Sequence, residues 1–426
     1  MPSITDHPLR FSLANELHAR PFPSLSAPCV AVFLAVKQPM RAIARDRGVD
    51  RAHLLNLLDR FGAVHPSPNS NHYFGKIGRH TLKWESHSEF VTYTVFIEHL
   101  SERAFDPADF EVFPADWLSL APGVRITSAL IRIETRNSQE TLSRAISDWF
   151  VGESVAVARV LGDTATIAGD FRIDAAGHSR FAVSADKDIG KRSLGRVVQR
   201  LCEIETYKTM SMLGFSRVGE MSGRMGQVDV ELTRLIEEMS GNTLPAQDTL
   251  MGLLKVSAEL EAMVSQASFR FSATHAYEEI VVQRIEVLRE ERFEGRQTFE
   301  EFMSRRYTPA MRTVSSAEVR LRAMADRAMR AGDLLRTRVD VERSTQNQSL
   351  LESMDRRADA QLRLQRTVEG LSVVAISYYA VSLAAYLLYP AAEMAQISRG
   401  VMTAGITLPI VGIVWWAMRQ VRKRLD

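Results

Sequence analysis

The pattern of hydrophobic and polar residues changes character twice along the 426-residue chain. The first part has short apolar or alternating runs, such as Cys29–Val36 and Phe90–Phe96, which are typical of β-strands. Further strands are expected at Thr81–Glu85, Val124–Glu134, Val155–Leu161, Thr164–Ile173 and Arg180–Ser184, with helices around His53–Phe61 and Thr141–Phe150. Because helices are interspersed with strands, residues 1–188 are predicted to form a mixed α+β or α/β domain.

Residues 189–369 are predicted to form long antiparallel helices and a coiled stalk. Apolar residues recur there at steps of three, four or seven, first over Leu194–Met239, then from Pro245 onward. A third run contains no proline between Pro309 and Pro390. Its seven-residue repeat consists of Val314, Leu321, Ala328 and Leu335.

Several positions are expected to weaken these helices. Gly214, Gly219 and Gly223 are possible breaks in the first run, because glycine has low helix propensity. Gly332 and the polar patch Ser344–Ser349 interrupt the repeat in the third run. A kink or a change of packing partner is predicted there.

Two stretches near the C-terminus carry no charged residue. Gly370–Tyr389 has 20 residues and Val401–Met418 has 18, and about 20 helical residues cross the roughly 30 Å hydrocarbon core of a bilayer. Residues 370–426 are therefore predicted to form a two-helix transmembrane hairpin, with spans at 370–389 and 401–418. The alternative is two buried helices of a large soluble core.

Basic residues predict the orientation of this hairpin. The connecting segment Pro390–Gly400 carries only Arg399, whereas eight basic residues flank the two stretches on their other sides. These are Arg356, Arg357, Arg363, Arg366, Arg419, Arg422, Lys423 and Arg424. Since Lys and Arg are enriched in cytoplasmic flanks, both ends of the hairpin are expected in the cytoplasm and the turn in the periplasm.

Small and hydroxyl-bearing residues follow one face of the first stretch. Ser372, Ala375, Tyr379, Ser382 and Tyr386 recur at steps of three and four. Two interpretations are open: Ser372, Tyr379, Ser382 and Tyr386 line a polar pore in an oligomer, or the stripe packs helices closely. Neither stretch contains an ionisable Asp, Glu, Lys, Arg or His, which disfavours a proton-relay transporter.

Composition narrows the classes of function. Charged residues make up 24% of the chain and the net charge is +2, which is typical neither of a disordered protein nor of a basic nucleic-acid binder. Cys29 and Cys202 lie far apart in the sequence, so no disulfide framework or CxxC site is expected. The N-terminus lacks a basic segment followed by an apolar one, so no secretory signal is expected.

Few residues suggest chemistry. His72, His80, Glu85 and His87 cluster, and a zinc site requires such a set, but their spacing matches no established ligand pattern and solvent-facing side chains are the alternative. No P-loop, GxGxxG or GxSxG motif occurs, and Gly75–Gly78 is interpreted as a turn. Neither a cofactor nor enzyme activity is therefore expected.

The segment His18–Pro23 combines an imidazole, a guanidinium and an aromatic ring with two prolines. Its side chains His18, Arg20 and Phe22 have two interpretations. They bind an anion, or they form a docking arm in which Phe22 tucks into the domain.

Two stretches resemble a known family. Leu13–Pro23 reads LANELHARPFP and Gln361–Tyr379 reads QLRLQRTVEGLSVVAISYY. They are similar to a bacterial family of predicted membrane-anchored proteins of unknown function, and the resemblance covers the whole chain. It implies membrane anchoring and carries over no activity.

A looser resemblance is architectural. A mixed domain, long helices that continue into a first span, and a second span with a basic tail are similar to CorA-like two-span metal-ion transporters. That resemblance implies a homo-oligomer whose first span lines a cation pore. The chain departs from it at Tyr389-Pro390-Ala391, which stands in place of the Gly-Met-Asn signature, so that family's magnesium filter is not supported.

These patterns predict a non-enzymatic protein of the bacterial inner membrane, with both termini and a large domain in the cytoplasm. Its expected role is that of a homo-oligomeric scaffold or sensor. A CorA-like channel or transporter is the alternative, and a metal-dependent enzyme built on the histidine cluster is a weaker third hypothesis. The expected partners are the lipid bilayer, further copies of the chain and, for a channel, a cation; nucleic acid is not expected.

Overall fold

The computed structural model describes residues 4–16, 22–39, 42–68, 70–241, 245–395 and 397–425. The chain forms two compact units. The sheet-and-bundle unit comprises Met1–Thr243 and Met251–Ala331, and the C-terminal unit comprises Leu244–Leu250 and Gly332–Asp426. The sequence-based division at 188/189 and 369/370 stays a prediction.

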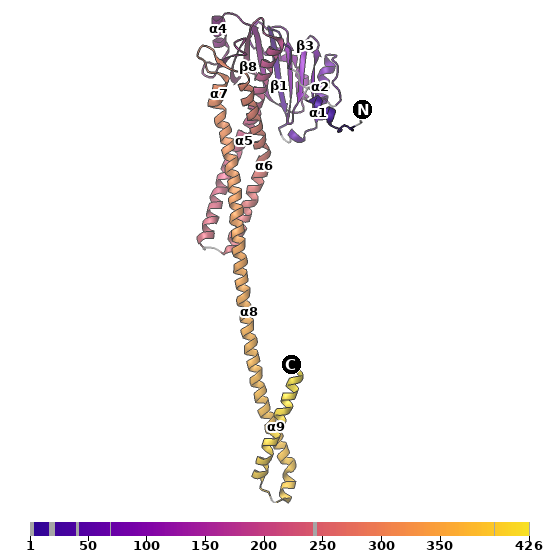
Figure 1. Cartoon of the computed structure of the whole chain (residues 1–426), viewed down its shortest axis with the longest axis vertical. Helices are drawn as coiled ribbons and strands as arrows, with labels where there is room; N and C mark the ends of the chain where they lie inside the picture. The colour runs from indigo at the N-terminus through magenta and orange to yellow at the C-terminus, as the bar shows by residue number, and fades with distance from the viewer. Residues whose placement is uncertain are drawn as a thin grey trace. The chain divides into compact units, whose positions relative to one another are not determined.

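A nine-stranded sheet, counted over the described residues, organises the sheet-and-bundle unit (Figure 1). Its strands are β1 Cys29–Lys37, β2 His72–Ile77, β3 His80–Ser86, β4 Phe90–Ile97, β5 Val124–Thr135, β6 Ala156–Val160, β7 Ala165–Ile173, β8 Ser179–Ala185 and β9 Glu291–Arg292. Their order is β2-β3-β4-β1-β5-β8-β7-β6-β9, and only β5 and β8 are parallel among these neighbours. A mixed α and β N-terminal region is confirmed.

The sequence pattern misses strand β2. Gly75–Gly78 was expected to be a turn, but Gly75 lies inside β2, opposite Leu82 of β3. The chain reverses three residues later, at Gly78, whose φ of 55° is the left-handed conformation that glycine adopts easily. The turn interpretation is wrong because Ile77 and its neighbours continue the ladder up to that residue.

Both faces of the sheet are covered. The helices α2 Arg47–Arg60, α3 Ala115–Ser119 and α4 Gln139–Trp149 contribute to one large apolar core with one face of the strands. On β4, Val91, Tyr93 and Val95 point into that core, while the alternate residues point to the other face, against helix α5. The shorter elements are α1 Arg10–Glu16, η1 Ala42–Ala44, η2 Pro107–Val112 and α7 Phe299–Arg306.

Three long helices complete this unit: α5 Lys191–Gly241, α6 Ala246–Glu286 and the first part of α8 Thr308–Met394. They lie side by side in Figure 1. Arg224 of α5 pairs with Glu259 of α6, and Arg217 with Gln266, so these two helices are antiparallel. The prediction of long helices is confirmed.

The expected break in α5 is absent. The helix continues through Gly214, Gly219 and Gly223. A Cβ atom on Gly214 would lie 2.2 Å from Oγ1 of Thr274 on α6, so this glycine permits the close approach of two helices. The expectation of breaks is wrong because packing outweighs the low helix propensity of glycine.

Helix α8 changes its surroundings along its length. The residues of its seven-residue repeat, Val314, Leu321, Ala328 and Leu335, are buried, whereas every residue from 340 to 368 is exposed. The predicted change of packing near Gly332 is therefore observed, although the helix itself is unbroken. Helix α8 continues through Pro390 to Met394, five residues beyond Tyr389, and the end of the first span at Tyr389 stays a prediction.

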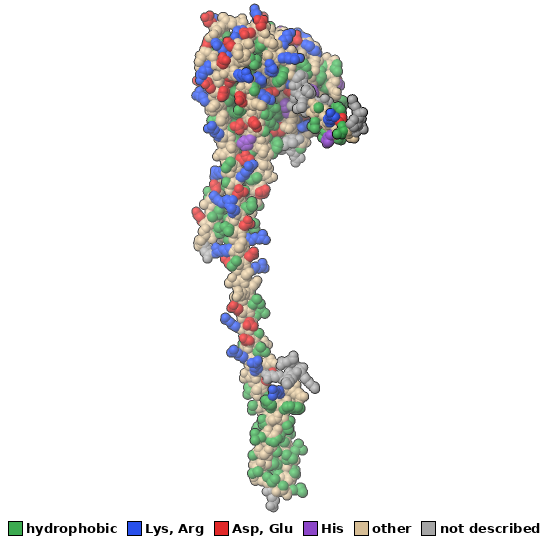
Figure 2. Space-filling view, viewed as in Figure 1, with side chains coloured by type: hydrophobic (Ala, Val, Ile, Leu, Met, Phe, Trp, Pro, Cys, Tyr) green, Lys and Arg blue, Asp and Glu red, His purple; other side chains and the backbone are tan. Residues whose placement is uncertain are grey.

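A second apolar helix, α9 Arg399–Leu425, follows. The two helices α8 and α9 are long and apolar enough to cross a membrane, and 6% and 0% of their most apolar windows are buried. The alternative of two buried core helices does not fit this exposure. Hydrophobic side chains cover the visible surface of the hairpin (Figure 2). Helix α8 ends at Met394 and α9 begins at Arg399, and the predicted connecting segment Pro390–Gly400 stays a prediction.

Candidate functional site

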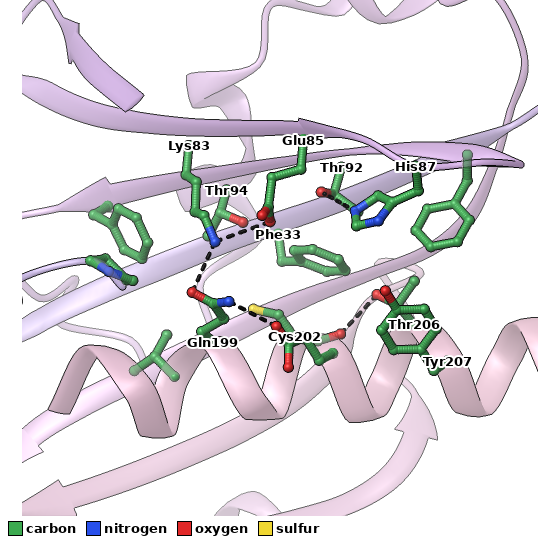
Figure 3. A pocket seen from close by; sticks show the side chains of 15 residues that line it. Phe33, Lys83, Glu85, His87, Thr92, Thr94, Gln199, Cys202, Thr206 and Tyr207 are labelled. Atoms are coloured by element: carbon green, nitrogen blue, oxygen red, sulfur yellow. Dashed lines mark hydrogen bonds and ion pairs between the residues drawn. The ribbon is translucent and has the colours of Figure 1, made fainter. Parts of the chain in front are cut away.

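A cleft lies between α5 and the sheet face formed by β1, β3 and β4 (Figure 3). The cleft is narrow, and its cavity volume is about 30 Å³. The lining residues combine aromatic rings, hydroxyls and charges, and they are Pro23, Phe33, Lys83, Glu85, His87, Phe90, Thr92, Thr94, Phe96, Val198, Gln199, Cys202, Glu203, Thr206 and Tyr207. The strand residues belong to the faces of β3 and β4 that point away from the large core.

A chain of polar side chains crosses one end of the cleft. Nζ of Lys83 lies 3.0 Å from Oε2 of Glu85 and donates a 2.8 Å hydrogen bond to Oε1 of Gln199. Gln199 in turn donates a 2.7 Å bond to Oε1 of Glu203. The side chains of Lys83 and Glu85 are only 6% and 14% exposed. Each charge is compensated within the chain, as a buried ion pair requires.

Aromatic rings form the other end of the cleft. The imidazole of His87 stacks on Phe90 with ring centroids 4.4 Å apart, and it meets Tyr207 of α5 edge-on at 6.3 Å. Oγ1 of Thr92 lies 3.4 Å from Nε2 of His87. The cleft thus offers flat apolar surface at one end and charge at the other.

A buried arginine holds the turn between β3 and β4 in place through hydrogen bonds. Arg45 pairs with Asp50 at 2.7 Å and donates hydrogen bonds to the carbonyl oxygens of His87 at 2.6 Å and Phe90 at 3.2 Å. A guanidinium with several donors satisfies the carbonyls of a whole turn. His87 and Phe90 therefore sit on a rigid support.

A second buried charge ties the same turn to helix α6. Glu89 is fully buried; it pairs with Arg270 and accepts a 2.8 Å hydrogen bond from the hydroxyl of Tyr277. Burial, and then the charge of Glu89, raise the pKa of Tyr277, so this phenol stays protonated and donates. The turn is held from two sides.

The cleft is better suited to binding than to nucleophilic chemistry. Its thiol, Cys202, is buried, and burial raises the pKa of this group, so the reactive thiolate is disfavoured. Its lysine is held in an ion pair. The expected lack of enzyme activity nevertheless stays a prediction.

The four residues proposed for zinc do not form a ligand set. His72 lies opposite Glu85 across β2 and β3, whereas His80 lies at the far end of the same hairpin, opposite Ile77. Within the described residues, which include all four, no three His, Cys, Asp or Glu side chains are placed to share a metal. Glu85 and His87 line the cleft instead.

The proposed docking arm lies partly outside the described residues, since His18 and Arg20 are not among them. Phe22 is 47% exposed and does not tuck into the domain, so this expectation is wrong. Pro23 is buried in its place and lines the cleft. A Cβ atom on Gly195 would lie 1.7 Å from the carbonyl oxygen of Pro23, so the segment crosses α5 at a glycine.

The proposed pore-lining residues lie on α8 within the C-terminal unit. The hydroxyls of Ser372 and Ser382 donate to the carbonyl oxygens of Val368 and Tyr378, at 2.8 and 2.9 Å. Their polarity is therefore satisfied by their own helix. Tyr379 and Tyr386 are exposed, and a pore formed by these four residues stays a prediction.

Sequence reasoning missed the cleft. A signal was present on α5, where Gln199, Cys202, Glu203 and Thr206 share one side at steps of three and four. A second signal was the presence of Lys83 on β3 and of Thr92 and Thr94 at alternate positions of β4. Polar residues on alternate positions of a strand usually face solvent, and only the position of α5 shows that these do not.

Comparison with curated proteins and with solved structures gives no match in either case. The resemblance to CorA-like transporters thus gains no support. A family model described as a protein of unknown function (DUF3422) matches residues 5–425. Because this match covers nearly the whole chain, the protein belongs to the DUF3422 family.

Proposed function

We propose that the protein is anchored in the bacterial inner membrane by the end of α8 and by α9, and that its sheet-and-bundle unit is a cytoplasmic scaffold or sensor. One observation carries the proposal: the most apolar windows of these helices are 6% and 0% buried. Exposing so much apolar surface to water costs about 25 cal/mol per Å². A bilayer removes that cost.

The distribution of charge supports the orientation. Arg356, Arg363 and Arg366 precede the apolar part of α8, and Arg419 follows that of α9, whereas Arg399 is alone between them. Positive flanks remain in the cytoplasm. The turn between α8 and α9 is then periplasmic.

Membrane extraction tests the anchor. Leu383→Arg combined with Leu408→Arg places a charge in each apolar stretch, at a cost of about 3 kcal/mol each near the bilayer centre. We expect the natural chain to float with membranes and resist an alkaline carbonate wash, and the double variant to be lost from that fraction. Leu334→Arg with Leu362→Arg is the matched control and leaves anchoring intact. Release of the natural chain by carbonate would refute the proposal.

Thiol labelling tests the orientation. Met394→Cys lies at the exposed end of α8 and Glu352→Cys lies before its apolar part. A membrane-impermeant maleimide added to intact spheroplasts should label the first variant and spare the second. Both native cysteines are buried and contribute little background. Labelling of Glu352→Cys alone would reverse the orientation.

The cleft on α5 supports a sensor rather than a passive scaffold. It is narrow, but the residues that line it, aromatic rings with an ion pair and hydrogen-bonding side chains, are of the types that typically line a small-molecule site. Thr94→Trp would fill it. If a small molecule co-purifies with the natural chain, native mass spectrometry should show its loss in this variant; retention would remove the cleft from the proposal.

A CorA-like channel is the second candidate. The exposed Tyr379 and Tyr386, seven residues apart on one side of α8, favour it. Liposomes containing the protein should then pass Mg²⁺, Zn²⁺, Ni²⁺ or K⁺ faster than empty vesicles. An unchanged flux for all four would exclude this candidate.

A further inference from the structure

An extended segment, residues 22–26, lies against the start of α5 and forms part of the cleft wall. Its residues alternate between buried and exposed: Pro23 and Leu25 are buried, whereas Phe22, Ser24 and Ser26 are exposed. We call this segment the strap. Pro23 is the strap residue that lines the cleft. The strap therefore contacts the rest of the unit through one side only.

The strap meets α5 at a glycine. A Cβ atom on Gly195 would lie 1.7 Å from the carbonyl oxygen of Pro23, so the two backbones touch. The cleft residues Val198, Gln199 and Cys202 follow at steps of three, four and seven from that glycine, so they share its side of the helix. The strap thus closes the end of the cleft that carries the chain of polar side chains. The aromatic end lies about 18 Å further along α5, at a rise of 1.5 Å per residue.

The strap is held more weakly than the rest of the cleft wall. The other lining residues belong to strands or to α5, except His87, and Arg45 donates two hydrogen bonds to the turn that carries this histidine. Within the described part of the chain, one hydrogen bond joins the strap to the rest of the unit. It runs from the N–H of Leu25 to the carbonyl oxygen of Lys191 and measures 3.0 Å. Segments with few buried contacts and few hydrogen bonds open locally at a low cost in free energy.

The closed cleft is too small for an organic ligand. Its cavity volume of about 30 Å³ has room for water, whereas sites for small molecules typically measure about 300–1,000 Å³. The strands and α5 are fixed in the sheet and the bundle, so a ligand enters by displacing the strap. We propose that the strap and a ligand of the cleft exclude each other, so that binding in the cleft releases residues 22–26 from α5.

Exclusion couples the two events. A ligand that binds only when the strap is displaced shifts the equilibrium towards the released strap, and the docked strap weakens ligand binding to the same degree. Release of the strap is then the signal that the sensor gives. This closure deepens the proposed function and rests on it only in treating the cleft as a ligand site.

Thiol labelling of the purified full chain tests the closure without a ligand. Cys29→Ala leaves Cys202 as the one thiol of the chain. In this background, Gly195→Ala places a methyl group against the carbonyl oxygen of Pro23 and lifts the strap. N-ethylmaleimide should then modify Cys202 at least about tenfold faster. Gly219→Ala is the matched control, because its Cβ atom would meet no heavy atom within 4 Å, and it should leave the rate unchanged.

A change in the strap itself separates local opening from a distortion of α5. Leu25→Ala removes one of the two buried side chains of the strap, and Ser24→Ala is the matched control at the adjacent exposed position. We expect labelling of Cys202 to accelerate at least about tenfold in Leu25→Ala only. Hydrogen exchange in β1 reports unfolding of the sheet and should keep its natural rate. Unchanged labelling in either Gly195→Ala or Leu25→Ala, or faster labelling only together with faster exchange in β1, would overturn the closure.

A side chain that fills the cleft tests the exclusion. Thr94 is 7% exposed and lines the cleft. Because the cavity cannot hold an indole beside Pro23, Thr94→Trp should accelerate hydrogen exchange at the Leu25 amide at least about tenfold. Val49→Trp adds the same side chain at an exposed position of α2 and should leave this exchange unchanged.

The outcome is independent of the other parts of the proposed function. Carbonate extraction tests the anchor and native mass spectrometry tests the ligand, whereas labelling of Cys202 and exchange at Leu25 require neither. Equal exchange at Leu25 in Thr94→Trp and Val49→Trp would show that the strap ignores the contents of the cleft, and it would overturn the exclusion alone.

Discussion

The two halves of helix α8 differ in surroundings although both carry an apolar repeat. Before Gly332 the repeat residues, such as Val314 and Leu321, are buried in the sheet-and-bundle unit. After it, Leu350 and Leu364 have equivalent spacing and are exposed. The difference shows that a heptad pattern indicates a partner without saying which one. For the first half the partners belong to the same chain, and for the second no partner lies among the residues that the structure describes.

The largest expected effect is a loss of stability, which we compare between one substitution in each half of α8. Leu321→Ala removes a side chain that is 2% exposed, and such a loss typically costs about 2–5 kcal/mol. Leu364→Ala should change monomer stability by less than about 0.5 kcal/mol. Hydrogen exchange over 308–331, measured at low protein concentration, should accelerate only in the first variant. Equal effects would mean that the halves do not differ in packing.

The next largest effect is a change in the stability of the sheet-and-bundle unit with pH. Burial raises the pKa of Glu290 from 4.5 to about 7, against the opposing effect of hydrogen bonds from the backbone N–H groups of Glu300 and Phe299 at the start of α7. The folded state therefore favours the protonated form. The raised pKa of Glu290 therefore stabilises the folded state. This stabilisation is fully present below pH 4.5 and is lost as pH rises through about 7.

The free energy of unfolding of the sheet-and-bundle unit should consequently fall by up to about 3 kcal/mol between pH 4.5 and 8. Urea unfolding followed by tryptophan fluorescence, to which the buried Trp84 and Trp117 contribute, measures this change. Glu290→Gln should flatten the pH profile. Glu352→Gln, in the exposed half of α8, should leave it unchanged; an equal change in both variants would contradict the assignment to Glu290.

A smaller, stabilising effect is expected at the junction of the two halves. A Cβ atom on Gly332 would meet no heavy atom within 4 Å, so Gly332→Ala should stabilise the helix by about 1 kcal/mol. The melting temperature should rise. Gly214→Ala is the contrasting variant, because its Cβ would clash with Thr274, and it should lower the melting temperature.

The smallest effect concerns the polar contacts of the buried half. Asp229 of α5 pairs with Arg320 at 2.7 Å and Arg327 at 3.4 Å, but both arginines are substantially exposed. Asp229→Asn should therefore cost less than about 1 kcal/mol, and less again in high salt. A larger loss, independent of salt, would show that these ion pairs and not the apolar repeat hold the first half of α8 in place.

Much of the fold was predictable because local patterns dominate it. The apolar run at Cys29–Val36 and the long run after Pro309 correspond to β1 and α8. Periodicity failed where tertiary contacts decide: Gly214 is a point of helix contact and Gly75 lies within a ladder. No local rule distinguishes a glycine that ends an element from one that admits a neighbour.

The candidate site was less predictable than the fold. Glu85 and His87 were singled out, but for a metal and not for a cleft. Their true neighbours, such as Gln199 and Tyr207, come from a helix more than a hundred residues later in the chain. A site assembled from such distant segments requires the sheet order and the position of α5, which a single sequence does not provide.

The position of β1 in the interior of the sheet, between β4 and β5, has a kinetic consequence. Val30 pairs with Ile97 on one side and Cys29 with Ile133 on the other, so neither neighbour is close in the chain. Contacts of such high sequence separation form slowly, because the intervening loop must close first. During synthesis, β1 emerges well before either partner. This apolar strand is therefore a segment at which a nascent chain is exposed to aggregation.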